Sequence, residues 1–269
     1  PSGWLQGDEW DSVMNYDAFM EPLTWFLTGM EKHSDEYQPE RIGKISDFEG
    51  AMRHYMTSFM TPSLYCAMNQ LSNHDHSRFL TRTNHRAGRA EFLGKESASE
   101  NVDYGVMREA VLVQMTWPGA PTVYYGDEAG MVGWTDPDNR RSYPWGKQDW
   151  ELIEFHKDMI RIHKKYECFR SGSYKSIASG SHWICYGRFN KKLQAVILIN
   201  NRREMLTVDL PIWQIGILEN ACLKRVIQTT QSTYNIGEVM ERAEDGILHV
   251  TVGPQTASVY IAAKNVEEN

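Results

Sequence analysis

SLYCAMNQLSNHDHSRFLTR, residues 63–82, begins with an apolar run and ends in a cluster of hydrogen-bonding side chains. The apolar part covers residues 63–71, and the polar cluster covers residues 73–78. An apolar run that stops in polar residues is typical of a buried strand with polar groups at its carboxyl end. In a (β/α) barrel, chemistry takes place at that end of the strands. The stretch therefore predicts a buried strand followed by a candidate site.

The sequence around this stretch alternates between strand-like and helix-like patterns. Ser46 with Glu49 three residues later predicts a capped helix start, and an apolar stripe at helical spacing follows. Pro118 is expected to end a later helix. Strand, helix, strand, helix indicates parallel strands joined by crossover helices. We expect strands at 12–16, 63–71 and 120–125, and helices at 22–30, 46–60, 104–117 and 150–166.

The pattern changes near Gly172, where short β-rich runs begin to alternate with turn residues. This pattern predicts an antiparallel β-sandwich of roughly ninety residues. The fold class is thus α/β followed by all-β, with one domain over residues 1–170 and a second over 171–269. The expected strands of the second domain are 183–189, 195–200, 206–210, 248–252 and 258–263.

Composition narrows the possible partners and compartments. The net charge is −7, and the acidic balance of the first 170 residues argues against nucleic acid as a partner. The four cysteines form no C-x-x-C pair and sit among apolar neighbours, so free buried thiols are expected. The sequence contains no run of 18 apolar residues, so no membrane span is predicted. With no initiator Met, the chain is expected to belong to a longer protein, whose compartment stays open with the cytoplasm favoured.

Asp75 is the first candidate for chemistry. At the end of a buried strand, its carboxylate can hold sugar hydroxyls and stabilise a positive, oxocarbenium-like centre. It can equally cap a turn or pair with Arg78, and His74 can either donate to a substrate or satisfy the loop backbone. A metal site on His74, Asp75 and His76 is disfavoured, because adjacent residues of an extended chain point to opposite faces.

Two further acidic clusters follow in the sequence. Asp136 and Arg140 lie four residues apart in a loop rich in turn formers, where they can clamp a polyol or neutralise each other. Their loop resembles the start of a calcium loop but lacks its Gly and its final Glu, so calcium is possible without support from this stretch. Asp127 and Glu128 follow another apolar run, and such carboxylates are either catalytic or cap the next segment.

Several motifs together resemble the alpha-amylase family of glycoside hydrolases. Residues 73–80, NHDHSRFL, resemble its fourth sequence signature, and residues 118–131 resemble its last barrel strand. The resemblance covers residues 1–170 in order, and the β-rich remainder corresponds to the family's small C-terminal domain. Residues 2–5, 11–16, 136–141 and 144–145 are similar to the neopullulanase, cyclomaltodextrinase and maltogenic-amylase branch.

The resemblance implies retaining cleavage or transfer of α-glucosidic bonds, in maltooligosaccharides, cyclodextrins or related α-glucans. Asp75 matches the family's third carboxylate, which grips the sugar hydroxyls and favours the distorted ring. His74 matches a histidine that hydrogen-bonds the same sugar, and Arg78 fits a supporting role. Asp136 and Arg140 match a pair that holds a glucose further along the donor side. The linkage and the particular glucan stay open.

The chain departs from the family in one large respect. The nucleophile and the acid belong to strands four and five, and only strands six to eight of the eight-stranded barrel match this sequence. We therefore expect the chain alone to be inactive, and Asp8, Glu9, Asp127 and Glu128 are not assigned to the missing roles. Since three parallel strands cannot close a barrel, association with itself or with the missing N-terminal half is expected.

Two rival functions remain. An amylase-like domain kept for glucan binding or protein contact would share the fold without the activity, since folds outlive their activities. A metal-dependent phosphohydrolase built on residues 74–76 is the weaker rival.

Overall fold

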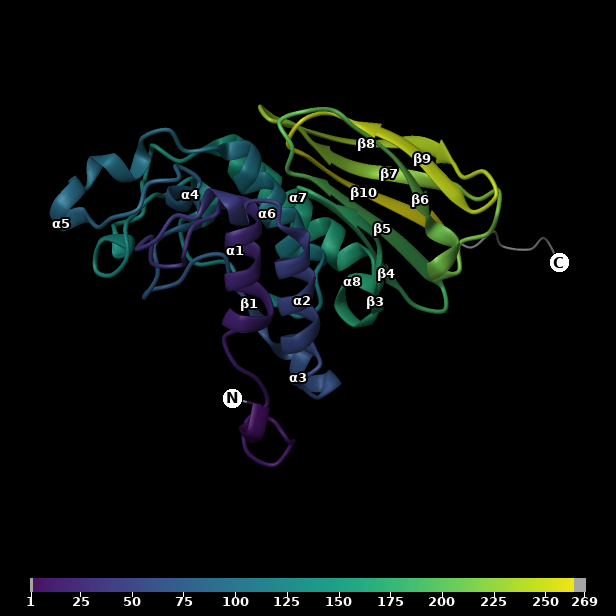
Figure 1. Cartoon of the computed structure of the whole chain (residues 1–269), viewed down its shortest axis with the longest axis horizontal. Coiled ribbons are helices and arrows are strands. Elements are labelled where there is room, and N and C mark those ends of the chain that lie inside the picture. Colours follow the sequence, from purple (N-terminus) through teal and green to yellow (C-terminus); the bar gives the residue numbers. More distant parts are fainter. Residues whose placement is uncertain (1, 264–269) are drawn as a thin grey trace.

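The computed structural model describes residues 2–263, and its ribbon divides into a helical part and an antiparallel sheet that follows it along the chain (Figure 1). The helical part holds the N-terminus, and the sheet lies beside it on the C-terminal side. The α-helices are α1 (Glu21–Thr28), α2 (Ile45–Met56), α3 (Thr61–Cys66), α4 (Phe79–Arg82), α5 (Ala90–Leu93), α6 (Tyr104–Thr116), α7 (Trp150–Lys165) and α8 (Cys168–Ser171).

Three short segments run parallel within the helical part. Strand β1 (Met68–Asn69) pairs with β2 (Ala120–Pro121), and Met14 forms a parallel bridge to Met68 on the other side. Backbone hydrogen bonds extend the contact, from the amide of Met68 to the carbonyl of Val13 and from the amide of Ala120 to that of Ala67. The predicted order of three parallel segments joined by helices is therefore present, with much shorter strands than expected.

The prediction of one strand over residues 63–71 was wrong for its first half. Leu64, Tyr65 and Cys66 belong to α3, which has Pro62 in its first turn. Proline starts helices readily because its missing N–H would be unpaired there anyway. A short apolar run is compatible with a buried strand and with a buried helix, so its hydrophobic pattern did not decide between the two.

The other two predicted strands are also shorter than expected. The strand predicted at 12–16 is reduced to the bridge at Met14, because Tyr16 begins a π-helical turn (Tyr16–Met20). The strand predicted at 120–125 ends at Pro121, and a turn follows in which the amide of Asp127 donates to the carbonyl of Tyr124. Both segments thus leave the parallel sheet soon after their paired residues.

Four predicted helices are present, but the predicted N-terminal cap of one of them is not. Helices α1, α2, α6 and α7 lie where the sequence placed them, but Ser46 does not cap α2. Glu49 instead accepts a hydrogen bond from Ser176 Oγ at 2.7 Å, so a tertiary contact takes the side chain from the expected capping box. Asp103 and Asp149 cap α6 and α7, each accepting from a backbone amide two to three residues ahead.

All five strands predicted after Gly172 are present, together with three that were missed. A six-stranded antiparallel sheet has the order β3 (Ser173–Gly180), β4 (Trp183–Phe189), β5 (Leu193–Asn200), β10 (Thr256–Ala263), β7 (Cys222–Thr229), β8 (Tyr234–Arg242). A separate antiparallel pair joins β6 (Leu206–Pro211) to β9 (Ile247–Val252). The missed β8 is an edge strand with mostly exposed side chains, so it lacks a clear apolar pattern.

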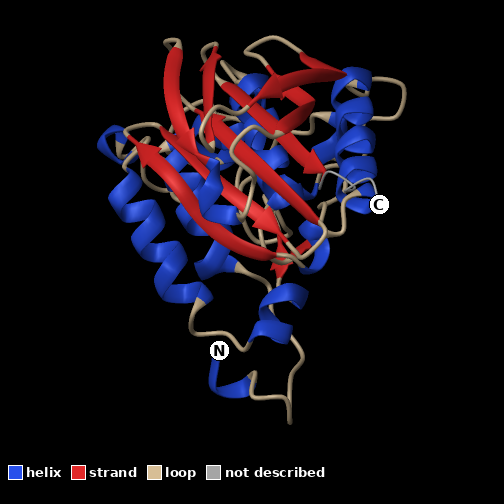
Figure 2. Ribbon diagram, turned by 90° about the vertical axis from the view of Figure 1, so that its right-hand side faces the viewer, coloured by secondary structure: helices blue, strands red, loops and turns tan. Residues whose placement is uncertain are grey.

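Strands β4 and β5 of the six-stranded sheet are buried on both faces. Figure 2 shows helices beside the strands. Ile197 and Ile199 of β5 pack into the core shared with α1, α2, α6 and α7. Val196 and Leu198 of the same strand face the core shared with β6 and β9. Because successive strand residues point to opposite faces, this one strand joins both cores.

Two details of composition are settled by the fold. Cys168 and Cys185 are buried free thiols as predicted, but Cys66 and Cys222 are exposed, so that part of the prediction was wrong. No helix within residues 2–263 is long and apolar enough to cross a membrane.

Candidate functional site

The candidate site lies where the loop after β1 meets the loop after β2. The side chain of Thr135 donates to the carbonyl of Asp75 at 2.7 Å, and the amide of Asp136 lies 3.4 Å from the same oxygen. The amide of Arg78 donates to the carbonyl of Gly133 at 2.9 Å. A Cβ at Gly133 would lie 2.8 Å from the Cα of Asn139, so the turn between them closes only around glycine. Two segments about sixty residues apart in sequence therefore form one surface.

Asp75 and His74 present their side chains to solvent. Their side chains are 52% and 56% exposed, and Asp75 Oδ1 lies 3.4 Å from His74 Nε2. The amides of Asp75 and His76 both donate to Asn73 Oδ1, at 2.9 and 3.1 Å. This Asx turn fixes the backbone while the carboxylate of Asp75 stays accessible. The alternative pairing of Asp75 with Arg78 is not present, because Arg78 is bonded elsewhere.

Asp136 and Arg140 form an ion pair at the surface, with side chains 45% and 47% exposed. Arg140 is the last residue of a short 3-10 turn (Asp138–Arg140), four residues after Asp136 in the chain. The pair is adjacent along the chain to Thr135, whose hydroxyl binds the Asp75 backbone. All four predicted substrate-contacting residues thus lie on the two joined loops, with accessible polar groups.

Arg78 is fully buried beneath these loops. Its Nη1 donates to Asp127 Oδ1 at 2.9 Å and to the carbonyl of Tyr125 at 2.8 Å, and its Nε donates to the carbonyl of Asn139 at 2.9 Å. Burial raises the pKa of Asp127, and the guanidinium of Arg78 opposes that rise. The buried ion pair ties the loop after β1 to the loop after β2.

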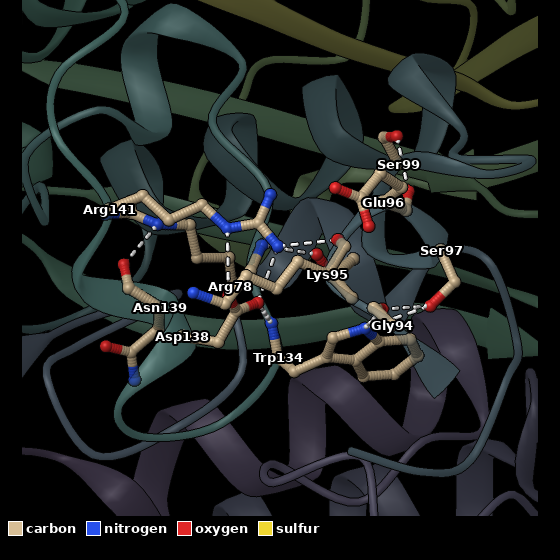
Figure 3. A network of polar contacts seen from close by, with 12 residues as sticks. Arg78, Gly94, Lys95, Glu96, Ser97, Ser99, Trp134, Asp138, Asn139 and Arg141 are labelled. Carbon is tan, nitrogen blue, oxygen red and sulfur yellow. Dashed lines mark hydrogen bonds and ion pairs between the residues drawn. The ribbon is translucent and has the colours of Figure 1, made fainter. Parts of the chain in front are cut away.

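A third segment completes the support, as Figure 3 shows. The indole Nε1 of Trp134 donates to the carbonyl of Gly94 and to Ser97 Oγ, both at 3.2 Å. The carboxylate of Asp138 accepts from the amide of Trp134 at 2.9 Å and from Arg141, whose Nη2 also donates to the carbonyl of Lys95 at 2.7 Å. The loop from 134 to 141 is therefore held by Arg78 and by the segment 94–97.

Three aromatic residues near the site were not assigned roles from sequence. His76 is buried, with its ring centroid 4.9 Å from that of Tyr16 and 4.6 Å from that of His33. Burial, reinforced by nearby Arg82, lowers the pKa of His76 to about 3. Burial and the negative charge of Asp75 raise the pKa of Tyr16.

The hydroxyl of Tyr16 also accepts from Asn73 Nδ2 at 2.9 Å, which places it beside the Asx turn. Tyr16 had a sequence signal in the motif at 11–16, whereas His33 had none, because its segment reads as an ordinary surface loop. Across residues 2–263, no group of three or more His, Cys, Asp and Glu side chains is arranged to hold a metal ion.

Comparison with known proteins finds matches in sequence. The family model for the alpha-amylase catalytic domain matches residues 2–205. Neopullulanase 2 of Thermoactinomyces vulgaris is 32% identical over 219 residues, covering 80% of this chain and 32% of that protein. An amylopullulanase of Thermoanaerobacter thermohydrosulfuricus is 30% identical over 188 residues, covering 68% of this chain and 12% of that protein. The chain thus spans about a third or less of these curated relatives.

Solved structures match over nearly the whole chain. A debranching enzyme from Nostoc punctiforme superposes with a TM-score of 0.73 at 23% identity, covering 97% of this chain and 49% of that one. A structure described as a cyclomaltodextrinase gives a TM-score of 0.72 at 22% identity, covering 96% of this chain and 38% of that one. At these identities the likeness concerns the fold.

Proposed function

This chain belongs to the alpha-amylase family of glycoside hydrolases, and from that premise we propose that it forms part of a retaining enzyme acting on α-glucans. In this proposal the three parallel segments are strands six to eight of a (β/α)8 barrel, and the antiparallel strands form the sandwich domain behind it. The names neopullulanase and cyclomaltodextrinase among the relatives support pullulan, cyclodextrins and maltooligosaccharides as substrates.

One observation carries the proposal. The exposed carboxylate of Asp75 and the exposed Asp136–Arg140 pair lie on two loops that share a backbone contact, above a buried network that holds both. Exposed polar groups over a rigid support suit recognition of a polyhydroxylated ligand, because their orientation is set before binding.

The proposed chemistry assigns one task to each residue. Asp75 accepts hydrogen bonds from the hydroxyls of the sugar at the cleavage point and stabilises the positive charge of the oxocarbenium-like transition state. His74 donates to a hydroxyl of the same sugar, and Asp136 with Arg140 clamps a glucose further along the donor side. Arg78 holds the two loops in register from below.

Retention needs a nucleophile and an acid about 5 Å apart, and we propose that both lie in a part of the parent protein outside this sequence. The isolated chain is therefore expected to be inactive, since the covalent nucleophile and the proton donor supply most of the rate enhancement. Calcium has no assigned role in this scheme.

The test compares the parent protein with the isolated chain on maltooligosaccharides, cyclodextrins and pullulan. The parent should turn over at least one of them, the isolated chain should not, and Asp75→Asn in the parent should lower kcat by about 100-fold or more. Asp209→Asn is the matched control, because Asp209 also forms an exposed pair with a histidine, His249, at 2.6 Å, but lies in β6.

Three outcomes would contradict the proposal. Turnover by the isolated chain would refute the assignment of the nucleophile and acid to another part of the parent. Glucan binding by the parent without any turnover would support the non-catalytic rival. An Asp75→Asn parent as active as the Asp209→Asn parent would remove Asp75 from the reaction.

A further inference from the structure

We propose that Asn139 is a positioning residue that holds Asp75 and the Asp136–Arg140 pair in one fixed geometry. The proposal rests on the function proposed above and deepens it. Asn139 is fully buried, and its Nδ2 donates to the carbonyl of His74 at 3.1 Å and to the carbonyl of His76 at 2.7 Å. One amide group thus grips the backbone on both sides of Asp75.

Thr135 completes the grip from the same loop. Its hydroxyl donates to the carbonyl of Asp75 itself, at 2.7 Å, so three consecutive carbonyls are held by side chains from 135–139. From the other side, Asn73 Oδ1 accepts the amides of Asp75 and His76. The backbone of residues 74–76 is therefore held by three side chains, two of which come from the loop that carries Asp136 and Arg140.

The arrangement of the amide argues for a role in geometry. If the side chain of Asn139 were turned over, its oxygen would face two carbonyl oxygens, so the network sets the orientation of the amide. The amide nitrogen, and not the oxygen, therefore holds the backbone on both sides of Asp75.

The backbone of Asn139 also contacts the buried Arg78–Asp127 ion pair. Its carbonyl accepts from Arg78 Nε at 2.9 Å, and Arg78 is paired with Asp127. Asn139 thus connects the buried ion pair to the carbonyls flanking Asp75. Displacement of the Asp75 carboxylate by about 1 Å relative to the Asp136–Arg140 pair would misplace a sugar chain that must contact both, and such misplacement can cost about 100-fold in rate.

The chain offers a matched control in Asn200. Asn200 is also fully buried, and its Nδ2 also joins two carbonyls, those of Glu204 at 3.1 Å and Gly253 at 2.7 Å. Asn200 lies in β5, in the antiparallel sheet. Asn200 Oδ1 also accepts from the amide of Arg202 at 3.2 Å. Asn139→Ala and Asn200→Ala both remove a pair of amide–carbonyl hydrogen bonds, and only the first removes them beside Asp75.

The experiment measures kcat and KM of the parent protein on a maltooligosaccharide for both variants, with their thermal unfolding. We expect kcat/KM to fall about 10- to 100-fold in Asn139→Ala and to change by less than about twofold in Asn200→Ala, at similar losses of stability. Should Asn139→Ala fail to fold, Thr135→Val removes one hydroxyl at constant shape, with Thr135→Ser restoring activity. Equal kinetic effects at positions 139 and 200 would overturn the proposal.

A second readout does not depend on turnover. In a crystal structure of the Asn139→Ala parent, the hydrogen bonds from Thr135 Oγ1 and the Asp136 amide to the Asp75 carbonyl should lengthen or break. An unchanged arrangement of residues 73–77 and 134–140 would refute the inference. A wild-type parent without α-glucan turnover would instead refute the proposed function, so the two failures are distinguishable.

Discussion

At the residue scale, Arg78 is the side chain on which both site loops depend. It is fully buried and bonded to Asp127 and to the carbonyls of Tyr125 and Asn139. Removing one partner of a buried ion pair leaves an uncompensated charge, which typically costs about 3–5 kcal/mol. We expect Arg78→Met to lower the free energy of unfolding by that amount, measured by urea denaturation.

Arg140→Met is the control for this prediction. Arg140 pairs with Asp136 at the surface, with its side chain 47% exposed, and exposed pairs contribute about 0–1 kcal/mol. A similar loss of stability in the two variants would show that the Arg78–Asp127 pair is not the support described above.

His76 makes a pH-dependent contribution at the same scale. Its pKa is lowered from 6.5 to about 3 by burial, so the folded protein holds it neutral while the unfolded chain protonates it near pH 6.5. Between about pH 6.5 and pH 3 the unfolded state binds more protons, and stability therefore falls as the pH falls. We expect His76 to contribute about 2.5 kcal/mol to the loss of stability between pH 7 and pH 4.5.

NMR titration of the histidine ring signals tests this directly. The His76 signals should show no titration near pH 6.5 in the folded chain. The pH dependence of thermal unfolding should become shallower in His76→Gln. A His76 midpoint near 6.5 would contradict the prediction.

At the element scale, helix starts show how local signals compete with tertiary contacts. Ser46 and Glu49 have the spacing of a capping box, yet Glu49 bonds to Ser176 across 127 positions. Asp149 has a weaker sequence signal but accepts from the amide of Leu152 at 2.8 Å and caps α7. A cap is therefore decided by which partner the folded chain offers.

This difference gives a paired prediction. Asp149→Ala should destabilise the chain by about 1 kcal/mol, because an orphan amide at the start of α7 loses its acceptor. Ser46→Ala should change the stability by less than about 0.5 kcal/mol, because Ser46 is exposed and caps no amide. Thermal unfolding of both variants checks this, and a larger loss from Ser46→Ala would reverse the assignment.

At the scale of the whole molecule, the parallel segments form only a small sheet. Within residues 2–263 they comprise β1, β2 and the bridge at Met14, too few to close a barrel. Large apolar side chains are exposed in the helical part, among them Trp4, Trp10, Met14, Val123 and Trp145. Such surfaces and open strand edges favour association.

We expect the isolated chain to associate at micromolar concentration, which light scattering measures. Co-expression with the N-terminal part of the parent should replace self-association by a one-to-one complex, because in the function proposed above strands from that part would cover the same surface. A monodisperse monomer of the isolated chain would contradict this expectation.

The sequence by itself determined the class of elements and the family. Helix α7 has a clear amphipathic period, helix α6 is a long apolar run that stops before Pro118, and strand β4 is a short apolar run that stops before Asn190, so local pattern was sufficient to place them. The motifs at 73–80 and 118–131 carried the resemblance that the comparisons confirm. Local patterns did not separate helix from strand at residues 63–66, because a short apolar run suits both.

Only the tertiary structure decided how the candidate site is held together. Arg78 meets Asp127 across 49 positions, and Asn139 meets the carbonyl of His76 across 63. Contacts of this kind leave no periodic trace, because each depends on a single buried donor finding an acceptor in a distant loop. The sequence therefore proposed which side chains face the sugar, and the fold determined which buried groups hold them there.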